Sequence, residues 1–565
     1  MSTATMSGPE VSTPNDLCNG QMKAVKVGEN QNVLLIKVQD KYYATTAKCT
    51  HLGAPLEKGV LTSDGRLTCP WHGACFDVKT GDIEDAPAMH CLKTFTSRIE
   101  GDQVVISVSQ EALKEPRPLP IRGSRKRKEI TAVIIGNGVG GQSAAESLRE
   151  YGFNGRVVVV GKEPYLPIDR TKLSKSLDNT AEKIALRKQE FYTEREIELK
   201  IGEEVKSVDF DKKVVTLADG NTQDYSYLVI SPGSTPRKLD LPGANLKNVH
   251  VLRSLTDNND LQKALTAFPK PNVVIIGTGW IGMELGSVMA KDGKAKVTIV
   301  DKGDIPLKPV LGYDIGKFIK RWHEANGIKF ISNTGPKKFV ASEDDPAKVG
   351  SVLLDNGQTV SADVVLVAIG AGPATEWLKP SPLLNDDGSI TVNKYLQVES
   401  RKEVFVAGDV AKFPVSDSRN VRVEHYNVGR NTGREIGRNI SIAAAAAEKD
   451  STKAPKFTPF TKVPYFWSVQ WGKSIRYAGS GPYDEVYIEG DLTSKKGEDT
   501  SFAAYYAQNG KVVAVASLNK DPVVSQFSEL ARLGRCPSLA EIKAGKDILT
   551  VPIGPASESC GNPNL

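Results

Sequence analysis

The sequence has few cysteines, no long apolar run and no strong excess of one charge, and each feature excludes a class of protein. No apolar run approaches the roughly 20 residues that a membrane span requires. Lys and Arg number 73 against 67 Asp and Glu in 565 residues, and a net charge of +6 is no strong signal for nucleic-acid binding. Because 40% of the residues are hydrophobic and 25% are charged, a mainly disordered chain is also excluded.

The cysteines and the start of the chain bear on location. There are seven cysteines, and none forms a CxxC pair. An odd number at low density disfavours a disulfide scaffold and a CxxC redox site, and it favours a reducing compartment. The start, MSTATMSGPEVSTPND, lacks the basic and apolar regions of a secretory signal and the Arg-rich pattern of a mitochondrial presequence. We therefore expect a cytoplasmic protein.

The hydrophobic pattern changes along the chain and predicts several domains. Short strand-like runs separated by turn signals predict a small all-β domain, and a stretch rich in Pro, Gly and charge predicts a flexible linker after it. Two βαβ patterns then predict two α/β nucleotide-binding domains, and aromatic strands with an amphipathic helix predict a C-terminal α+β domain. The expected ranges are an N-terminal tail (1–19), the all-β domain (20–110), the linker (111–129), the first nucleotide domain (130–256 and 385–455), the second (257–384), the C-terminal domain (456–550) and a tail (551–565).

Two cysteines and two histidines in the all-β segment form the pattern C-x-H-x17-C-x2-H. These residues are Cys49, His51, Cys69 and His72. Two thiolates and two imidazoles fit a tetrahedral zinc site, and they also fit a Rieske [2Fe–2S] site. The surrounding segments, CTHLGAPLEKGV and CPWHGACFDVKTGDIEDAP, resemble the Rieske signature much more closely than a zinc ribbon. The resemblance implies that the two cysteines hold one iron and the two histidines the other.

Two glycine-rich loops each follow an apolar strand and open a predicted helix. The glycines that we expect to allow a pyrophosphate to approach the backbone are Gly136, Gly138 and Gly141 in the first loop and Gly277, Gly279 and Gly282 in the second. An acidic residue follows the next strand of each unit, at Glu163 and at Asp301, and is expected to bind a ribose 2′-hydroxyl. Because a carboxylate repels a 2′-phosphate, NADH is favoured over NADPH.

Further segments, VFVAGD at 404–409, DRTKLSK at 169–175 and VPYFWS at 463–468, resemble the FAD/NAD pyridine-nucleotide reductases. With the Rieske segment, the chain resembles the Rieske-containing, apoptosis-inducing factor-like branch of the pyridine nucleotide-disulfide oxidoreductases of the ferredoxin reductase type. This resemblance implies FAD in the first nucleotide domain, NADH in the second, and a [2Fe–2S] cluster. The site residues that it implies are Lys175 and Glu284 near flavin N5, Arg170 on the FAD pyrophosphate, Asp409 on the ribityl or pyrophosphate region, and Trp467 along the isoalloxazine ring or its access channel.

The function implied by the resemblance is an NADH-dependent flavoprotein oxidoreductase. Electrons would pass from NADH through FAD to the fused Rieske cluster and on to an unidentified small molecule or redox protein. One alternative is a redox signalling protein of the apoptosis-inducing factor type, with slow turnover. Another is the flavin and Rieske part of a nitrite-reductase-like system, which would need a sirohaem-binding cysteine cluster that the sequence does not contain. Monomer and dimer both stay open.

Overall fold

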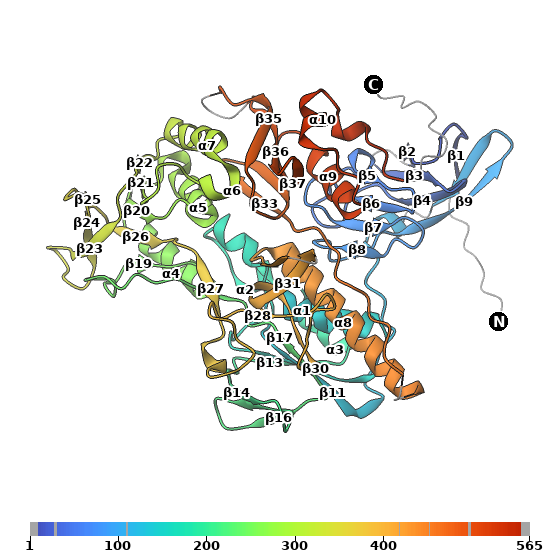
Figure 1. The fold of residues 1–565 in the computed structure, drawn as a ribbon, viewed down its shortest axis with the longest axis horizontal. Helices are drawn as coiled ribbons and strands as arrows, with labels where there is room; N and C mark the ends of the chain where they lie inside the picture. Colours follow the sequence, from blue (N-terminus) through green and yellow to red (C-terminus); the bar gives the residue numbers. More distant parts are fainter. Residues whose placement is uncertain are drawn as a thin grey trace.

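The computed structural model describes residues 10–27, 31–108, 111–416, 419–450, 453–494 and 499–554. Figure 1 shows a small β unit in blue at one end and two α/β units in the middle and at the opposite end, with a C-terminal unit in red beside the blue one. The all-β, Rossmann-like and α+β classes predicted from the sequence are therefore confirmed. No helix among the described residues is long and apolar enough to cross a membrane.

The N-terminal unit contains two antiparallel sheets. The larger sheet has the strand order β1 (Glu10–Pro14), β10 (Gln103–Ser107), β9 (Thr94–Glu100), β4 (Lys41–Thr46), β3 (Asn32–Val38) and β2 (Met22–Lys26). The smaller sheet has the order β5 (Val60–Leu61), β6 (Arg66–Thr68), β7 (Cys75–Asp77) and β8 (Ile83–Asp85). Strand β1 lies in the segment expected to be a tail, and it pairs along its whole length with β10. The pairing therefore extends the unit to residue 10.

The first nucleotide domain has a central, mostly parallel sheet. Its strand order is β13 (Ile197–Ile201), β12 (Gly155–Gly161), β11 (Arg127–Ile135), β17 (Tyr227–Ile230), β30 (Arg401–Val406) and β29 (Gln397–Val398). Smaller sheets contain β14 (Val205–Asp209), β15 (Val214–Leu217) and β16 (Thr222–Asp224), and β28 (Ile390–Thr391), β31 (Ala411–Ser416) and β32 (Arg419–Arg422). The helices are α1 (Val139–Glu150), α2 (Ala181–Ile184), α3 (Gln189–Glu194) and α8 (Tyr426–Lys449). The Val/Ile runs of β11 and β12 are almost wholly buried, as expected for parallel strands covered on both faces.

The second nucleotide domain repeats this plan. Its parallel sheet has the order β19 (Val249–His250), β26 (Val364–Val367), β20 (Asn272–Ile276), β21 (Lys296–Val300) and β22 (Lys329–Ile331). The remaining elements are β23 (Pro336–Ala341), β24 (Val349–Leu354), β25 (Thr359–Ser361), and helices α4 (Leu255–Thr266), α5 (Trp280–Ala290), α6 (Lys308–Leu311) and α7 (Tyr313–Ala325). The chain passes twice between the two nucleotide domains. Strands β18 (Ser234–Pro236) and β27 (Ala371–Pro373) lie in these two connecting segments and pair with each other. Because β19 belongs to this sheet, the boundary expected at 256 lies before residue 249.

The C-terminal unit is an antiparallel sheet covered by helices. Its strand order is β33 (Tyr465–Gln470), β34 (Lys473–Gly479), β37 (Lys511–Leu518), β36 (Ser501–Gln508) and β35 (Glu485–Asp491). Helices α9 (Val523–Arg532) and α10 (Leu539–Lys543) follow it. Helix α9 buries Val523, Val524, Phe527 and Leu530 against the sheet, so the amphipathic helix expected near 522–533 is present.

The expected linker is not a free spacer in the structure. Leu119 is buried, and its carbonyl accepts a hydrogen bond from Arg195. Arg117 donates to Asp82 and forms an isolated β-bridge with Cys91, both in the N-terminal unit, and β11 begins at Arg127. The prediction that residues 111–129 form a flexible linker was therefore wrong. Local composition predicted flexibility, but the segment gains order from contacts with residues far away in the sequence.

Candidate active site

The four predicted metal ligands lie on two adjacent loops of the N-terminal unit, which is called the Rieske unit below because it carries the predicted Rieske ligands. The Nδ1 atoms of His51 and His72 are 3.2 Å apart. Two nitrogens at roughly 2.1 Å from one metal ion are separated by about this distance. Cys49 and Cys69 are buried, and their thiols lie close enough to shift each other's pKa. The residues thus form one pair of imidazoles and one pair of thiols.

The spacing of the two pairs distinguishes a cluster from a single ion. Among the described residues, only Cys75, Asp85 and Glu529 bring three candidate ligand atoms within 4.8 Å of one another. The four Rieske-type ligands therefore do not converge as a mononuclear tetrahedral zinc site requires. Two separated pairs fit the two irons of a [2Fe–2S] cluster. Burial lowers the pKa of His51 to about 4 and that of His72 to about 2, so both imidazoles are neutral, which is the form that binds a metal.

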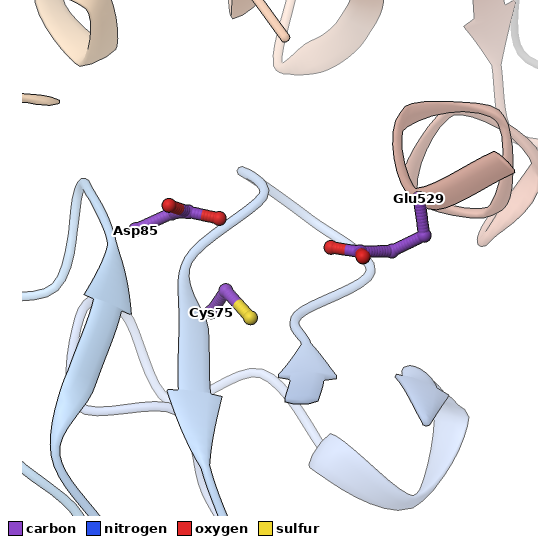
Figure 2. Close-up of side chains that lie close together, drawn as sticks. All are labelled: Cys75, Asp85 and Glu529. Atoms are coloured by element: carbon purple, nitrogen blue, oxygen red, sulfur yellow. The ribbon is translucent and has the colours of Figure 1, made fainter. Parts of the chain in front are cut away.

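The group of Cys75, Asp85 and Glu529 has another explanation. In Figure 2, Asp85 and Cys75 come from the Rieske unit and Glu529 from a helix of the C-terminal unit. Arg66 forms ion pairs with both carboxylates, and Lys462 pairs with Asp85. The negative charge is therefore already compensated by cations, and the group joins two units of the protein instead of offering a free metal site. The thiol of Cys75 is fully buried, as expected for a core residue.

The second ligand loop is fixed by the reductase part of the chain. Each of three backbone carbonyls in this loop accepts one side-chain hydrogen bond from a different element. The pairs are Asn427 Nδ2 to the His72 carbonyl (2.9 Å), Arg476 Nε to the Trp71 carbonyl (2.7 Å) and Ser525 Oγ to the Cys69 carbonyl (2.9 Å). All three hydrogen bonds cross from the Rieske unit to the remainder of the chain, so they hold the loop in one position.

The glycine loops have the backbone geometry that nucleotide binding needs. Gly136 has φ +103°, and a Cβ there would lie 2.1 Å from the Ser231 carbonyl oxygen. A Cβ at Gly141 would lie 2.0 Å from the Gly136 carbonyl oxygen, so these two positions serve close packing. A Cβ at Gly138, by contrast, would meet no atom outside its chain neighbours within 4 Å, which leaves room for a phosphate at the N-terminus of α1.

The second loop follows the same plan. Gly277 has φ +111° and packs against the Ala368 carbonyl, while Gly282 packs against Gly277. The space at Gly279 is almost open, with its nearest neighbour at 3.9 Å. Asp301 follows β21 and accepts a hydrogen bond from the Thr278 amide inside the loop, at 2.7 Å. The carboxylate therefore helps to shape the loop as well as lying beside it.

A chain of polar contacts lies beside the first glycine loop. Glu163 accepts hydrogen bonds from Arg170 (2.9 Å) and from Tyr165. Arg170 also donates to the Arg253 carbonyl, and the Arg253 guanidinium reaches Asp409 at 3.1 Å. The structure thus brings Glu163, Arg170 and Asp409 into one network, with Arg170 paired to Glu163. Arg253 was missed, because an arginine after a two-residue strand has no motif of its own.

Lys175 and Glu284 come from distant parts of the chain and form an ion pair with an N–O distance of 2.9 Å. Glu284 is buried on α5 and accepts further hydrogen bonds from Ser174 and, at 2.8 Å, from Ser468 on β33. Three donors therefore fix both carboxylate oxygens. The two serines were not predicted, since a hydroxyl that positions a carboxylate leaves no signature in the sequence.

Trp467 lies between the Rieske loops and the reductase. Its ring centroid is 4.4 Å from that of His72 and 5.7 Å from that of His51. His425, another histidine near the second FAD motif, instead occupies the N-cap position of α8 without a side-chain capping hydrogen bond, and its ring packs on Phe466 at 4.1 Å. Burial lowers the pKa of His425 to about 4, so it is neutral.

Comparisons with known proteins agree with this arrangement. Residues 130–433 match the family of pyridine nucleotide-disulphide oxidoreductases, and residues 9–96 match the Rieske [2Fe–2S] domain. Apoptosis-inducing factor 3 of Mus musculus is 37% identical over 538 residues, which cover 94% of this chain and 84% of that protein. A ferredoxin–NAD(P)+ reductase of Sphingomonas sp is 31% identical over 68% of this chain and 89% of its own length.

Solved structures show the same likeness. The structure of a covalent putidaredoxin reductase–putidaredoxin complex superposes with a TM-score of 0.66 and 28% identity, covering 75% of this chain and 98% of that chain. The domain matches imply FAD, a nicotinamide nucleotide and a [2Fe–2S] cluster as cofactors, which confirms the cofactors expected from the sequence. The chain belongs to the pyridine nucleotide-disulphide oxidoreductase family and carries a Rieske [2Fe–2S] domain in addition.

Proposed function

We propose that the protein oxidises NADH and passes the two electrons, one at a time, to an acceptor through a [2Fe–2S] cluster held by Cys49, His51, Cys69 and His72. When bound, FAD accepts the hydride and the cluster carries single electrons, which is chemistry that the cofactors supply. The proton that enters with the hydride is released as the electrons leave. The residues of this chain bind and orient the cofactors. A cytoplasmic location is part of the proposal and rests on the sparse cysteines of the sequence.

One observation carries this proposal: adjacent residues of β33 contact both candidate centres. Trp467 packs on His72, and Ser468 donates to Glu284, which pairs with Lys175. If Lys175 and Glu284 lie at the reacting edge of the flavin, the cluster and the flavin are near neighbours. Electrons then need no diffusing partner for their first transfer.

The names of the relatives help to define the acceptor. Several relatives are named as ferredoxin reductases, and one related structure joins putidaredoxin reductase to putidaredoxin. In the present chain, a Rieske unit is already attached and is held against the reductase by hydrogen bonds to its ligand loop. We propose that this unit is the first acceptor and that a separate small molecule or redox protein is the second.

The test is anaerobic reduction by NADH, followed by flavin absorbance and by the EPR signal of the cluster. Cys69→Ser should lose the EPR signal while its flavin is still reduced at the wild-type rate. Cys75→Ala is the matched control, because Cys75 is equally buried and lies six residues further on, but it is not one of the proposed ligands. Loss of the signal in both variants, or in neither, would contradict the proposed ligand set.

A second candidate function is redox signalling with slow turnover. It is favoured by the similarity to apoptosis-inducing factor 3, which covers 94% of this chain including the Rieske segment. The two functions differ in the rate at which the reduced protein passes its electrons to an acceptor. The test measures turnover with a panel of acceptors. A turnover rate far below the rate of flavin reduction would favour signalling. A turnover rate close to that of flavin reduction would favour the oxidoreductase.

A further inference from the structure

A large groove lies on the second nucleotide domain, away from its glycine loop. It has a volume of about 850 Å³ and is lined by the amino ends of β20, β21 and β22 and by the turn between β33 and β34. Lys296, at the start of β21, lines the groove, whereas Asp301 follows the opposite end of the same strand. At roughly 3.3 Å per residue, the two ends are about 15 Å apart. The groove is therefore a separate site from the expected NADH site.

The groove is strongly positive. Five lysines line it, against one carboxylate, that of Asp292. The lysines are Lys270, Lys291, Lys296, Lys329 and Lys473. Within the part of the chain that the structure describes, none of the five forms an ion pair. For a protein with a net charge of only +6, this is a local concentration of positive charge, and it favours an anion with several charges.

Trp471 lines one wall of the groove in an unfavourable backbone conformation. It is the first residue of the two-residue turn between Gln470 and Lys473 and has φ +51°, while Gly472 has φ +76°. Such turns favour Asn-Gly, and the left-handed region is unfavourable for a bulky residue. The half-buried ring packs on His323 at 5.6 Å. A tryptophan held in this conformation beside a charged groove points to a use for its ring.

We propose that this groove binds a nucleotide-class ligand, with its phosphates on the lysines and its base against the ring of Trp471. The volume lies within the range of small-molecule sites, roughly 300–1,000 Å³. The half-buried ring of Trp471 suits the base, and the unpaired ammonium groups suit phosphate oxygens. An exposed aromatic face can stack on a base of any kind. A concave site of this size with one aromatic wall favours a small ligand over an extended polyanion.

The test is calorimetric titration of the holoprotein with ATP in saturating NAD+, so that the NADH site is already filled. Wild type should bind one ATP, bind inorganic tripolyphosphate more weakly, and show no heat with adenosine. Lys296→Gln combined with Lys329→Gln should weaken ATP binding at least tenfold. Lys338→Gln, an exposed lysine on β23 outside the groove, is the matched control and should bind ATP as the wild type does.

Trp471→Asn tests the contact with the base separately from the contacts with the phosphates. Asparagine also suits this turn. It should weaken ATP at least fivefold and leave tripolyphosphate binding unchanged. NADH-driven flavin reduction should stay at the wild-type rate in all these variants. The test of this groove is therefore independent of the test of the proposed function. Absence of ATP binding in saturating NAD+ would refute the proposal. So would a single-stranded oligonucleotide that binds more tightly than ATP and is insensitive to Trp471→Asn.

Discussion

Replacement of Glu284 is the sharpest test of the reacting edge. The carboxylate side chain is 5% exposed and its partner Lys175 is 24% exposed, with 2.9 Å between them. Glu284→Gln keeps the shape of the side chain and removes its charge. A hydrogen bond to a charged group contributes about 1.5–3 kcal/mol and a neutral one about 0.5–1.5 kcal/mol, so the expected loss is about 1–2 kcal/mol. If this energy holds Lys175 beside the flavin, NADH should reduce the flavin about 5- to 30-fold more slowly.

The assay is anaerobic stopped-flow loss of flavin absorbance at several NADH concentrations. The limiting rate should fall, while the dissociation constant for NADH should change little, because neither side chain is expected to bind the nucleotide. Ser468→Ala is the matched control. It removes one donor to the same carboxylate but keeps the charge of Glu284 and its ion pair with Lys175, so the limiting rate should fall less than in Glu284→Gln. A wild-type limiting rate in Glu284→Gln with FAD fully bound would refute the role of this ion pair.

Three further predictions concern other parts of the chain. Asp301→Asn should raise kcat/KM for NADPH relative to NADH about fivefold or more. Two like charges about 4 Å apart repel each other by about 1 kcal/mol in water and by about 4 kcal/mol near a protein surface. Equal rates for both nucleotides in wild type would contradict this. Cleavage within 111–129 should leave the Rieske unit bound to the reductase in gel filtration. Glu529→Ala should weaken that binding by about 1.5–3 kcal/mol, since it removes the hydrogen bonds of this carboxylate with Arg66 and Thr68, while Arg66 keeps its ion pair with Asp85. Burial raises the pKa of Glu435 to about 6, so the folded state binds the proton of this carboxyl group more tightly than the unfolded state does. Stability is therefore lost as the pH rises from about 4.5 through 6. Glu435→Gln should therefore be more stable than wild type by about 2 kcal/mol in denaturant unfolding at about pH 8 and equal to it below about pH 4.

The sequence by itself determined the parts of the protein that depend on local spacing. The Rieske pattern could be read because loop ligands must recur at short, fixed intervals, and the glycine loops could be read because Gly136 and Gly277 need φ above +100°. Strands β3 and β37 have the same bounds as the apolar runs NVLLIKV and KVVAVASL, because a buried strand requires such a run. These features depend on neighbours in the chain.

Only the tertiary structure decided how these local units meet. Lys175 and Glu284 are 109 residues apart, and the hydrogen bond of Asn427 to His72 joins residues 355 apart. Leu119 lies in a segment whose composition predicts a flexible linker, yet it is buried by contacts that composition does not encode. The groove at Trp471 likewise combines strand ends and a hairpin from two domains. Local spacing specifies what each segment can bind, whereas the packing of distant surfaces decides which centres become neighbours.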